Sequence, residues 1–336
     1  MFFKKQPNSD KYKIEEVSFP IWEALWAKIS NVNLLQSWQY GKAKEQAEGW
    51  RAHRYVITDN NNRQIAITQL LIRTWPIVGG IARLNRGPLF LDDYPEEERL
   101  SVGVDIIKKL LNELRSKRCR VVQIAPELPY SENVKENLKR IGLRPINSTP
   151  WASAIMDLSK DNQKLLMQLN GKWRNCMRKG EKLGIIVKKV ELNGHNLNLL
   201  FSSYSGLQQN RKFQGLSEKL ISRLAEQTNE LWSFNLFFAW DSENEFDNVP
   251  IGQLVSIQSG DTTMYLIGTT TDKGRETQAN SVLLWQSIIH AKEVGCSWFD
   301  LGGLNTATPK GIAEFKKGLN ATPYALIGEF RGYFII

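Results

Sequence analysis

The sequence predicts an α/β protein made of two similar halves, each a mixed, twisted sheet flanked by helices. Its 336 residues are long for one domain and comfortable for two of about 150 residues each. Hydrophobic residues make up 42% of the chain and charged residues 24%, which is typical of folded globular proteins. The same order of elements (helix, paired strands, long helix, strand) also occurs twice along the chain.

The first half is expected to begin with a helix over residues 20–30 and to continue with strands over 63–75 and 81–91. A long helix follows, and a short buried strand over 118–125 completes the order. The apolar stripe that predicts the long helix consists of Ile107, Leu110, Leu111 and Leu114.

The second half repeats this order, with helical sequence over 197–228 and strands over 250–258 and 262–269. Its long helix ends near Gly295, and a strand over 297–301 follows it. The apolar stripe of that helix is Val282, Trp285, Ile288 and Ile289. A strand–helix–strand crossover requires a shared sheet with the helix packed on its face. A chance match of two unrelated α/β pieces is the alternative to a duplication, which we favour.

We place the domain boundary in the polar stretch 147–150, before a strand expected over 151–158. The first domain then covers residues 1–148 and the second covers 149–320.

The charge of the chain favours an anionic partner. Lys and Arg number 44 against 35 Asp and Glu, which gives a net charge of +9. Such an excess suits RNA, nucleotides or anionic lipid headgroups, with simple solubility as the alternative. The three cysteines (Cys119, Cys176 and Cys296) lie too far apart for a zinc or dithiol motif, which indicates a reducing compartment. No signal peptide or membrane span is recognisable, so we expect a cytoplasmic protein.

Several common catalytic motifs are missing from the sequence. It contains no P-loop, no G-x-S-x-G elbow, no H-E-x-x-H and no G-x-G-x-x-G. We expect structural roles for its three histidines, His53, His195 and His290. Metal, serine-hydrolase and kinase chemistry are therefore disfavoured, and no metal or organic cofactor is expected.

Three segments combine residues that suit ligand binding. Drawn as a helix, residues 171–184 place basic residues (Arg174, Arg178 and Lys182 beside Asn175, with Lys179 at the margin) opposite Trp173, Cys176, Met177 and Leu183. A basic stripe suits a phosphate backbone, and an ordinary solvated face is the alternative.

The second segment, residues 35–44, holds Trp38 and Tyr40 among lysines. This composition suits the binding of sugars, bases or phosphates, and the alternative is that the two rings are packing residues.

The third segment is 300–317, where Gly302 and Gly303 directly follow a buried strand. Glycines there let the backbone turn sharply, and ligands in open α/β sheets gather at the carboxyl ends of strands. A short helix over 312–319 then carries Lys316 and Lys317. One of these lysines can stabilise a developing oxyanion. The alternative is that both are surface residues and that Phe315 belongs to the core.

These segments resemble the Fem family of nonribosomal peptidyltransferases (FemX, FemA, FemB and MurM). The family's Q-x-x-x-W-x-x-x-K segment corresponds to Gln36–Lys44, with Tyr40 in the place of Trp. Its D-L-G-G, F-K and I-G-E motifs stand at 300–303, 315–316 and 327–329. The resemblance spans nearly the whole chain and implies two tandem GNAT-like domains, the first completed by residues 321–336.

The resemblance also implies roles for individual residues. It implies catalysis by Lys316, the transfer-assisting lysine, with Asp300 and Glu329, and it places Lys44 where FemX holds the precursor's nucleotide diphosphate. Leu216, Leu220 and Ile267 stand where FemX has an Arg and two Tyr that help to bind the precursor, with Lys212 among the neighbours able to substitute. The implied substrate-binding residues are Gln36, Trp38, Tyr40, Lys44, Tyr204, Arg211, Tyr265, Gly302, Gly303 and Phe315. The implied tRNA-binding residues are Lys172, Arg174, Arg178, Lys179 and Lys182.

The implied activity is transfer of an amino acid from aminoacyl-tRNA to an amine of a peptidoglycan precursor, in interpeptide bridge or branch formation. The partners would be aminoacyl-tRNA and a UDP- or lipid-linked muropeptide, with peripheral contact to the inner membrane face and no DNA. Two alternatives stay open. One is a GNAT-like N-acyltransferase that uses acyl-CoA, although the turn 275–280 carries Gln278 and Asn280 where Gly or Ala is expected. The other is a noncatalytic RNA- or envelope-associated binding protein.

Overall fold

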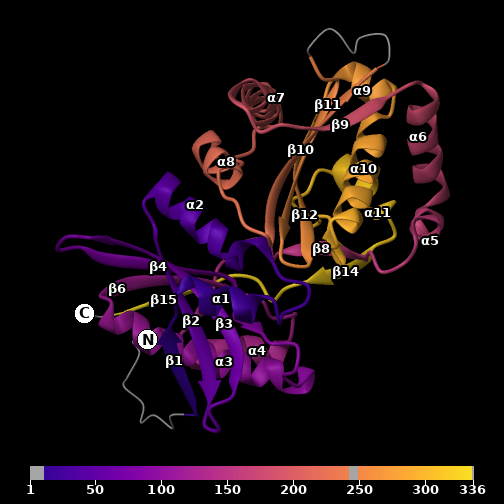
Figure 1. Ribbon diagram of the computed structural model, residues 1–336. Coiled ribbons are helices and arrows are strands. Elements are labelled where there is room, and N and C mark those ends of the chain that lie inside the picture. The colour runs from indigo at the N-terminus through magenta and orange to yellow at the C-terminus, as the bar shows by residue number, and fades with distance from the viewer. Residues whose placement is uncertain (1–10, 242–248, 335–336) are drawn as a thin grey trace. The chain divides into compact units, whose positions relative to one another are not determined.

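The computed structural model describes residues 11–241 and 249–334, and it confirms the predicted α/β class with two mixed sheets flanked by helices. The described residues form two compact units, one within Met1–Ala152 and Tyr324–Ile336 and the other within Ser153–Pro323. Both units are drawn in Figure 1. Within the two described ranges, no helix combines the length and hydrophobicity needed to cross a bilayer.

The first unit is built on a sheet with the strand order β1-β2-β3-β4-β6-β15-β7, with β5 beside β3. β4 and β6 are parallel, because the long helix α3 (Glu96–Ser116) crosses from one to the other, and the other neighbours are antiparallel. The strands are β1 (Tyr12–Glu16), β2 (Arg51–Asp59), β3 (Gln64–Trp75), β4 (Gly79–Gly87), β5 (Leu89–Phe90), β6 (Cys119–Pro126), β7 (Arg144–Pro145) and β15 (Phe330–Tyr333).

Helices cover both faces of this sheet. On one face α3 and α4 (Glu132–Arg140) enclose the core, where the predicted stripe residues Ile107, Leu110 and Leu114 are fully or almost fully buried. The other face carries α1 (Phe19–Trp26), the short 3-10 helix η1 (Leu34–Gln36) and α2 (Trp38–Glu48). Three glutamates in the first turn of α3 and an arginine in its last turn complement the helix dipole.

The second unit has the strand order β14-β8-β13-β12-β11-β10-β9 and the same crossover, since α10 (Ala279–Glu293) joins the parallel strands β12 and β13. Helices α5 (Asn162–Gln168), α6 (Gly171–Lys182) and α10 pack on one face, and α7 (Gly194–Arg211) and α8 (Glu218–Ala225) pack on the other. The strands are β8 (Ala152–Asp157), β9 (Ile186–Val190), β10 (Trp232–Trp240), β11 (Gly252–Ser259), β12 (Thr262–Thr270), β13 (Trp298–Asp300) and β14 (Thr322–Ala325). Two short helices, α9 (Asp272–Glu276) and α11 (Lys310–Lys317), complete the unit.

Several predicted boundaries were wrong for identifiable reasons. The single strand expected over 81–91 is two strands, β4 and β5, separated at Pro88, which has no N–H for a ladder. The helical sequence expected over 197–228 is two helices, because Lys212 adopts a left-handed conformation and ends α7. The helix expected over 20–30 ends at Trp26.

Candidate active site

In the second unit, the parallel strands β12 and β13 separate where β13 ends. These strands pair only over Thr262–Met264, and the chain leaving β13 turns at Gly302, whose φ is +66°. Helix α11 then returns to this point, and the Nζ of Lys316 donates a hydrogen bond to the carbonyl oxygen of Gly303 over 3.2 Å. The prediction that a lysine of this helix turns back to the strand end is therefore confirmed, and that lysine is Lys316.

Lys316 is a buried cation, with 5% of its surface exposed. Its Nζ lies 4.8 Å from the centre of the Tyr265 ring, where the aromatic face attracts a positive charge. Burial lowers the pKa of Lys316 to about 8, against the opposing effect of the negative charge of Asp300. At neutral pH, Lys316 is therefore protonated in roughly nine-tenths of the protein molecules. Because the side chain is buried, water screens the charge of its ammonium only weakly.

Asp300 organises the turn beside this lysine. Its carboxylate accepts a hydrogen bond from the Gly302 amide (2.8 Å) and another from the hydroxyl of Ser153 on β8. The Ser153 hydroxyl also lies 3.0 Å from the Gly302 carbonyl oxygen. Asp300 thus fixes the path of the glycine turn and supplies a negative charge that favours the ammonium form of Lys316. Ser153 was not among the residues predicted from the sequence, and the pairing of β8 with β13 brings it to Asp300.

A β-bulge brings Tyr265 to Lys316. Val255 pairs with Ile267 and Ser256 pairs with Tyr265, so Leu266 is an extra residue on β12. Side chains alternate along a strand, and the extra residue turns Tyr265 to the α10 face while Ile267 points to the opposite face. The Tyr265 hydroxyl occupies the place where a Cβ on Gly268 would stand. Burial raises the pKa of Tyr265 to about 12, so its phenol stays neutral at physiological pH.

Gly302 has a conformation and a close approach that only glycine fits. Its φ is +66°, and an added Cβ would stand 2.6 Å from the Tyr265 carbonyl oxygen. We expect Gly302→Ala to lower the free energy of unfolding by roughly 2–4 kcal/mol, measured by chemical denaturation. Gly303→Ala is the matched control for stability, since no heavy atom lies within 4 Å of an added Cβ there. Equal loss of stability in both variants would contradict this account of the turn.

Aromatic packing behind Lys316 orients α11. The Phe315 ring lies 5.8 Å from the Trp173 ring on α6, and a Cβ on Gly318 would come within 2.7 Å of the same indole. Phe315 thus packs on the core of the second unit, which agrees with the alternative that it is a core residue. In the structure it supports the position of Lys316.

Helix α6 has the predicted basic face, with two differences. Lys172, Arg178, Lys179 and Lys182 are exposed, whereas Arg174 is half-buried and donates to the Met167 and Leu169 carbonyl oxygens. Trp173 and Met177 are buried as predicted, but Leu183 is 47% exposed. The placement of Leu183 on the apolar side was wrong, because the helix ends at Lys182 and Leu183 is its C-cap.

In the first unit, the segment 36–44 forms a network within the fold. Gln36 is fully buried, and its amide donates to the Gln69 and Asn85 carbonyl oxygens and accepts from the Gln69 amide. It therefore bridges η1 to β3 and β4. The guanidinium of Arg54 lies 3.7 Å above the Trp38 ring and donates to the Trp38 carbonyl oxygen (3.0 Å), which holds the start of α2 against β2.

Tyr40 and Lys44 lie on the buried side of α2. Lys44 forms an ion pair with Glu48 one turn later, and Glu48 also accepts a hydrogen bond from the Trp50 indole (3.2 Å). Burial and the charge of Glu48 raise the pKa of Tyr40. Any phosphate that binds Lys44 must compete with Glu48, since the ammonium already has a carboxylate partner.

Glu329 also belongs to the first unit, where it accepts a hydrogen bond from Gln123 of β6 over 2.6 Å. Lys316 and Asp300, the other implied catalytic residues, belong to the second unit.

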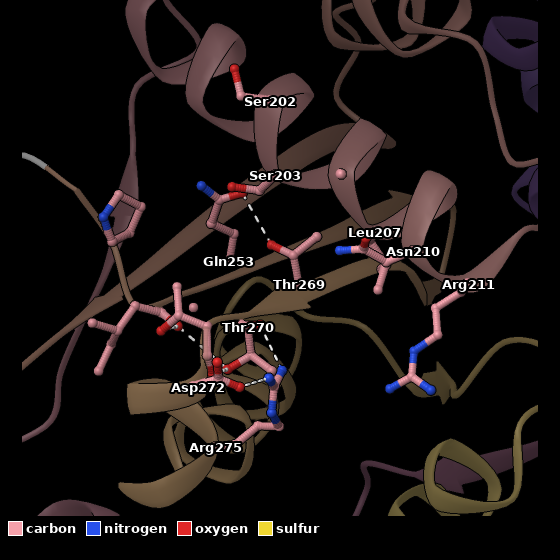
Figure 2. Close-up of a pocket in the computed structure, with 15 residues that line it drawn as sticks. Ser202, Ser203, Leu207, Asn210, Arg211, Gln253, Thr269, Thr270, Asp272 and Arg275 are labelled. Atoms are coloured by element: carbon pink, nitrogen blue, oxygen red, sulfur yellow. Dashed lines mark hydrogen bonds and ion pairs between the residues drawn. The ribbon is translucent and has the colours of Figure 1, made fainter.

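A pocket of about 600 Å³ lies on the α7 face of the second sheet (Figure 2). Ser203, Asn210 and Arg211 of α7 line one wall, opposite Thr270 and Arg275. Because the bulge turns Tyr265 to the other face, this pocket is separate from the surroundings of Lys316. Of the implied substrate-binding residues in the second unit, only Arg211 lines it.

Tyr204 stabilises the loop after α7. Its hydroxyl accepts a hydrogen bond from the Leu216 amide (3.2 Å), and a Cβ on Gly215 would overlap that hydroxyl.

Comparison with known proteins agrees with this architecture. A family model described as the FemAB family matches residues 23–141 and 196–334, well over half of the chain. The fold is similar to the crystal structure of FemX, with 17% identity, a TM-score of 0.74 and coverage of 96% of this chain and 97% of that one.

Two further solved structures share the fold. One is a tandem GNAT protein from the clavulanic acid biosynthesis pathway (10% identity, TM-score 0.54, coverage 96% and 98%). The other is L-PGS from Bacillus licheniformis (13% identity, TM-score 0.53, coverage 95% and 93%). No curated protein matches the sequence. At these identities the solved structures establish the tandem GNAT-like fold alone. The family match extends through both units, and the chain therefore belongs to the FemAB family.

Proposed function

We propose that this chain is an aminoacyltransferase that moves an amino acid from aminoacyl-tRNA to an amine of a peptidoglycan precursor in the cytoplasm. Membership of the FemAB family supports an acyltransferase in general. The observation that carries the finer proposal is the buried ammonium of Lys316 at the end of two parted parallel strands. A buried cation of this kind can stabilise the negative oxygen of an acyl-transfer intermediate, which supports the proposal.

The chemistry needs little beyond alignment and charge. The acceptor nitrogen attacks the carbonyl carbon of the aminoacyl ester, and the carbonyl oxygen becomes an oxyanion that the Lys316 ammonium stabilises. When the intermediate collapses, the bond to the ribose oxygen breaks and the amide forms. The proton lost by the amine balances the one gained by the ribose oxygen, with water or substrate as the carrier. No metal or organic cofactor enters this scheme.

The surroundings of α10 favour tRNA over CoA as the donor. In acyl-CoA enzymes of this fold the pyrophosphate needs the open turn before the corresponding helix. Here Gly180 of α6 packs on that turn, since a Cβ on Gly180 would stand 3.1 and 3.3 Å from the Thr277 and Gln278 carbonyl oxygens. Helix α6, which carries Gly180, also carries the basic face described above. We propose that its exposed cations contact the phosphates of tRNA.

The acceptor is proposed to be a muropeptide amine, carried on UDP or on lipid. Arg211 and the other polar residues of the α7 pocket are candidates to bind part of it.

The donor can be tested directly by incubating the protein with a muropeptide precursor and labelled aminoacyl-tRNA or acetyl-CoA. We expect label transfer from aminoacyl-tRNA only, and tRNA binding that weakens steeply between about 50 and 200 mM salt. Transfer from acetyl-CoA alone would reverse the choice of donor. Transfer from neither, with tRNA still bound, would favour the noncatalytic binding protein.

A further inference from the structure

The β3–β4 hairpin of the first unit exposes an apolar tip. Ile77 is 92% exposed, Val78 61% and Trp75 45%. Hairpin turns are usually made of Gly, Asn or Asp, which tolerate the backbone and suit water. In Figure 1 the purple hairpin of β3 and β4 extends outward from its sheet. Three large apolar side chains exposed at the end of a hairpin are unfavourable in water, and closing the hairpin does not require them. Exposed apolar patches of this kind mark interaction sites.

The backbone of the tip is strained as well. Ile77 has a φ of +68°, and the Val78 amide donates to the Pro76 carbonyl oxygen over 2.7 Å, which closes a γ-turn around Ile77. A β-branched residue rarely adopts this conformation, whereas glycine does so without cost. Strain of this kind tends to persist where a binding role compensates for it.

Arginines surround the base of the tip. The Arg73 guanidinium lies 5.3 Å from the centre of the Trp75 ring. The Gly80 amide donates to the Arg118 carbonyl oxygen (3.0 Å), and a Cβ on Gly79 would stand 3.0 Å from the Arg120 Cγ. All three arginines are exposed. Neither 64–91 nor 114–126 contains an Asp or Glu, so both sequence stretches that form this region are purely basic.

Acidic residues from outside these two stretches also come near, Glu16 of β1 and Glu113 of α3 among them. Glu16 of β1 lies 3.8 Å from Lys117 and pairs more closely with His53. The charge of Lys117 is therefore partly offset by Glu16.

We propose that this basic tip, made of Trp75, Ile77, Val78, Arg73, Arg118 and Arg120, docks on the surface of an anionic lipid bilayer. The apolar side chains enter the interface, where tryptophan is favoured, and the arginines bind headgroup phosphates. A lipid surface fits better than RNA, because isoleucine and valine offer no face on which bases stack. The charge pattern also matches an anionic leaflet and repels basic partners.

The proposal can be tested by sedimentation of the full chain with phosphatidylcholine vesicles that contain or lack phosphatidylglycerol. We expect binding only to the anionic vesicles. Ile77→Ser combined with Val78→Ser should lower the vesicle partition coefficient about tenfold or more. Arg118→Gln combined with Arg120→Gln should lower it by a similar factor, because each arginine contributes about fivefold near an anionic surface.

Matched controls separate the tip from general hydrophobicity and charge. Ile21→Ser, at a residue 46% exposed on α1, and Arg144→Gln, on β7, should leave partitioning unchanged. The emission of wild-type protein minus that of Trp75→Phe isolates Trp75, and this difference spectrum should shift to the blue on anionic vesicles. Unaltered circular dichroism and thermal unfolding would show that the tip variants are folded.

Three results would overturn the proposal. They are equal binding to neutral and anionic vesicles, full binding by both tip variants, and loss of tRNA binding in the tip variants with vesicle binding intact. The last result would identify an RNA interface. Because no acceptor or donor is present in the vesicle assay, its outcome is independent of the proposed transferase activity.

Discussion

Lys316→Met is expected to lower turnover by about 100-fold or more, because it removes the positive charge that we propose stabilises the oxyanion. Methionine has a similar length and no charge, so the side chain can still pack beside Tyr265. The effect should fall on kcat, since the charge develops only in the transition state. Steady-state kinetics with aminoacyl-tRNA and a muropeptide acceptor measures it.

The fold should survive this change, because the buried charge of Lys316 destabilises the folded protein. Burial lowers the pKa of Lys316 in the folded protein to about 8, below its ordinary value of 10.5. The contribution of Lys316 to the free energy of unfolding is therefore least favourable below pH 8, where the folded protein must hold the buried charge. That contribution becomes more favourable as the pH increases from about 8 to 10.5. At pH 7, Lys316→Met removes that unfavourable charge, and its thermal stability should equal or exceed that of the wild type.

Lys317→Met is the matched control, because Lys317 is the exposed neighbour on the same helix. It should keep nearly full turnover. Near-normal turnover in Lys316→Met would remove Lys316 from the mechanism, whatever the control shows.

Much of the fold was predictable because its long elements have strong patterns. The stripe of α3 is buried as expected, and so is that of α10 except for Ile289, which is half-buried. The strands β3, β6 and β12 begin within one residue of their predicted starts. β2 and β10 were missed. The sequence of β10, WSFNLFFAW, alternates between apolar and polar residues only in its first half and is continuously apolar from Leu236 on, so neither period extends through the strand. Breaks set by one residue, such as Pro88 or the left-handed Lys212, also escaped the periodicity argument.

The candidate site was predictable only where chemistry and chain order coincide. Gly302 and Lys316 lie close along the chain, and a strand end followed by a short helix brings them together. Ser153 lies 147 residues from Asp300 and reaches it only through the pairing of β8 with β13. The bulge that turns Tyr265 toward Lys316 leaves no mark in the sequence, since it arises from the register of two strands.

Asp300→Asn is expected to lower turnover at pH 7, and it tests whether the Asp300 carboxylate keeps Lys316 protonated. Asparagine has nearly the same shape, and its carbonyl oxygen can still accept from the Gly302 amide and the Ser153 hydroxyl. It lacks the negative charge that raises the pKa of Lys316, so that pKa should fall below 8. If it falls by one to two units, turnover at pH 7 drops by about 2- to 10-fold, because a smaller fraction of Lys316 carries a proton.

The distinguishing measurement is the pH dependence of kcat/KM. In the wild type, activity should rise as the acceptor amine loses its proton and fall above about pH 8, where Lys316 becomes neutral. In Asp300→Asn the alkaline decline should begin at lower pH, whereas Glu314→Gln, which removes an exposed carboxylate of α11, should leave it in place. A purely structural role for Asp300 would reduce activity equally at every pH. An unmoved alkaline decline in a folded Asp300→Asn protein would therefore show that the carboxylate does not maintain the charge of Lys316.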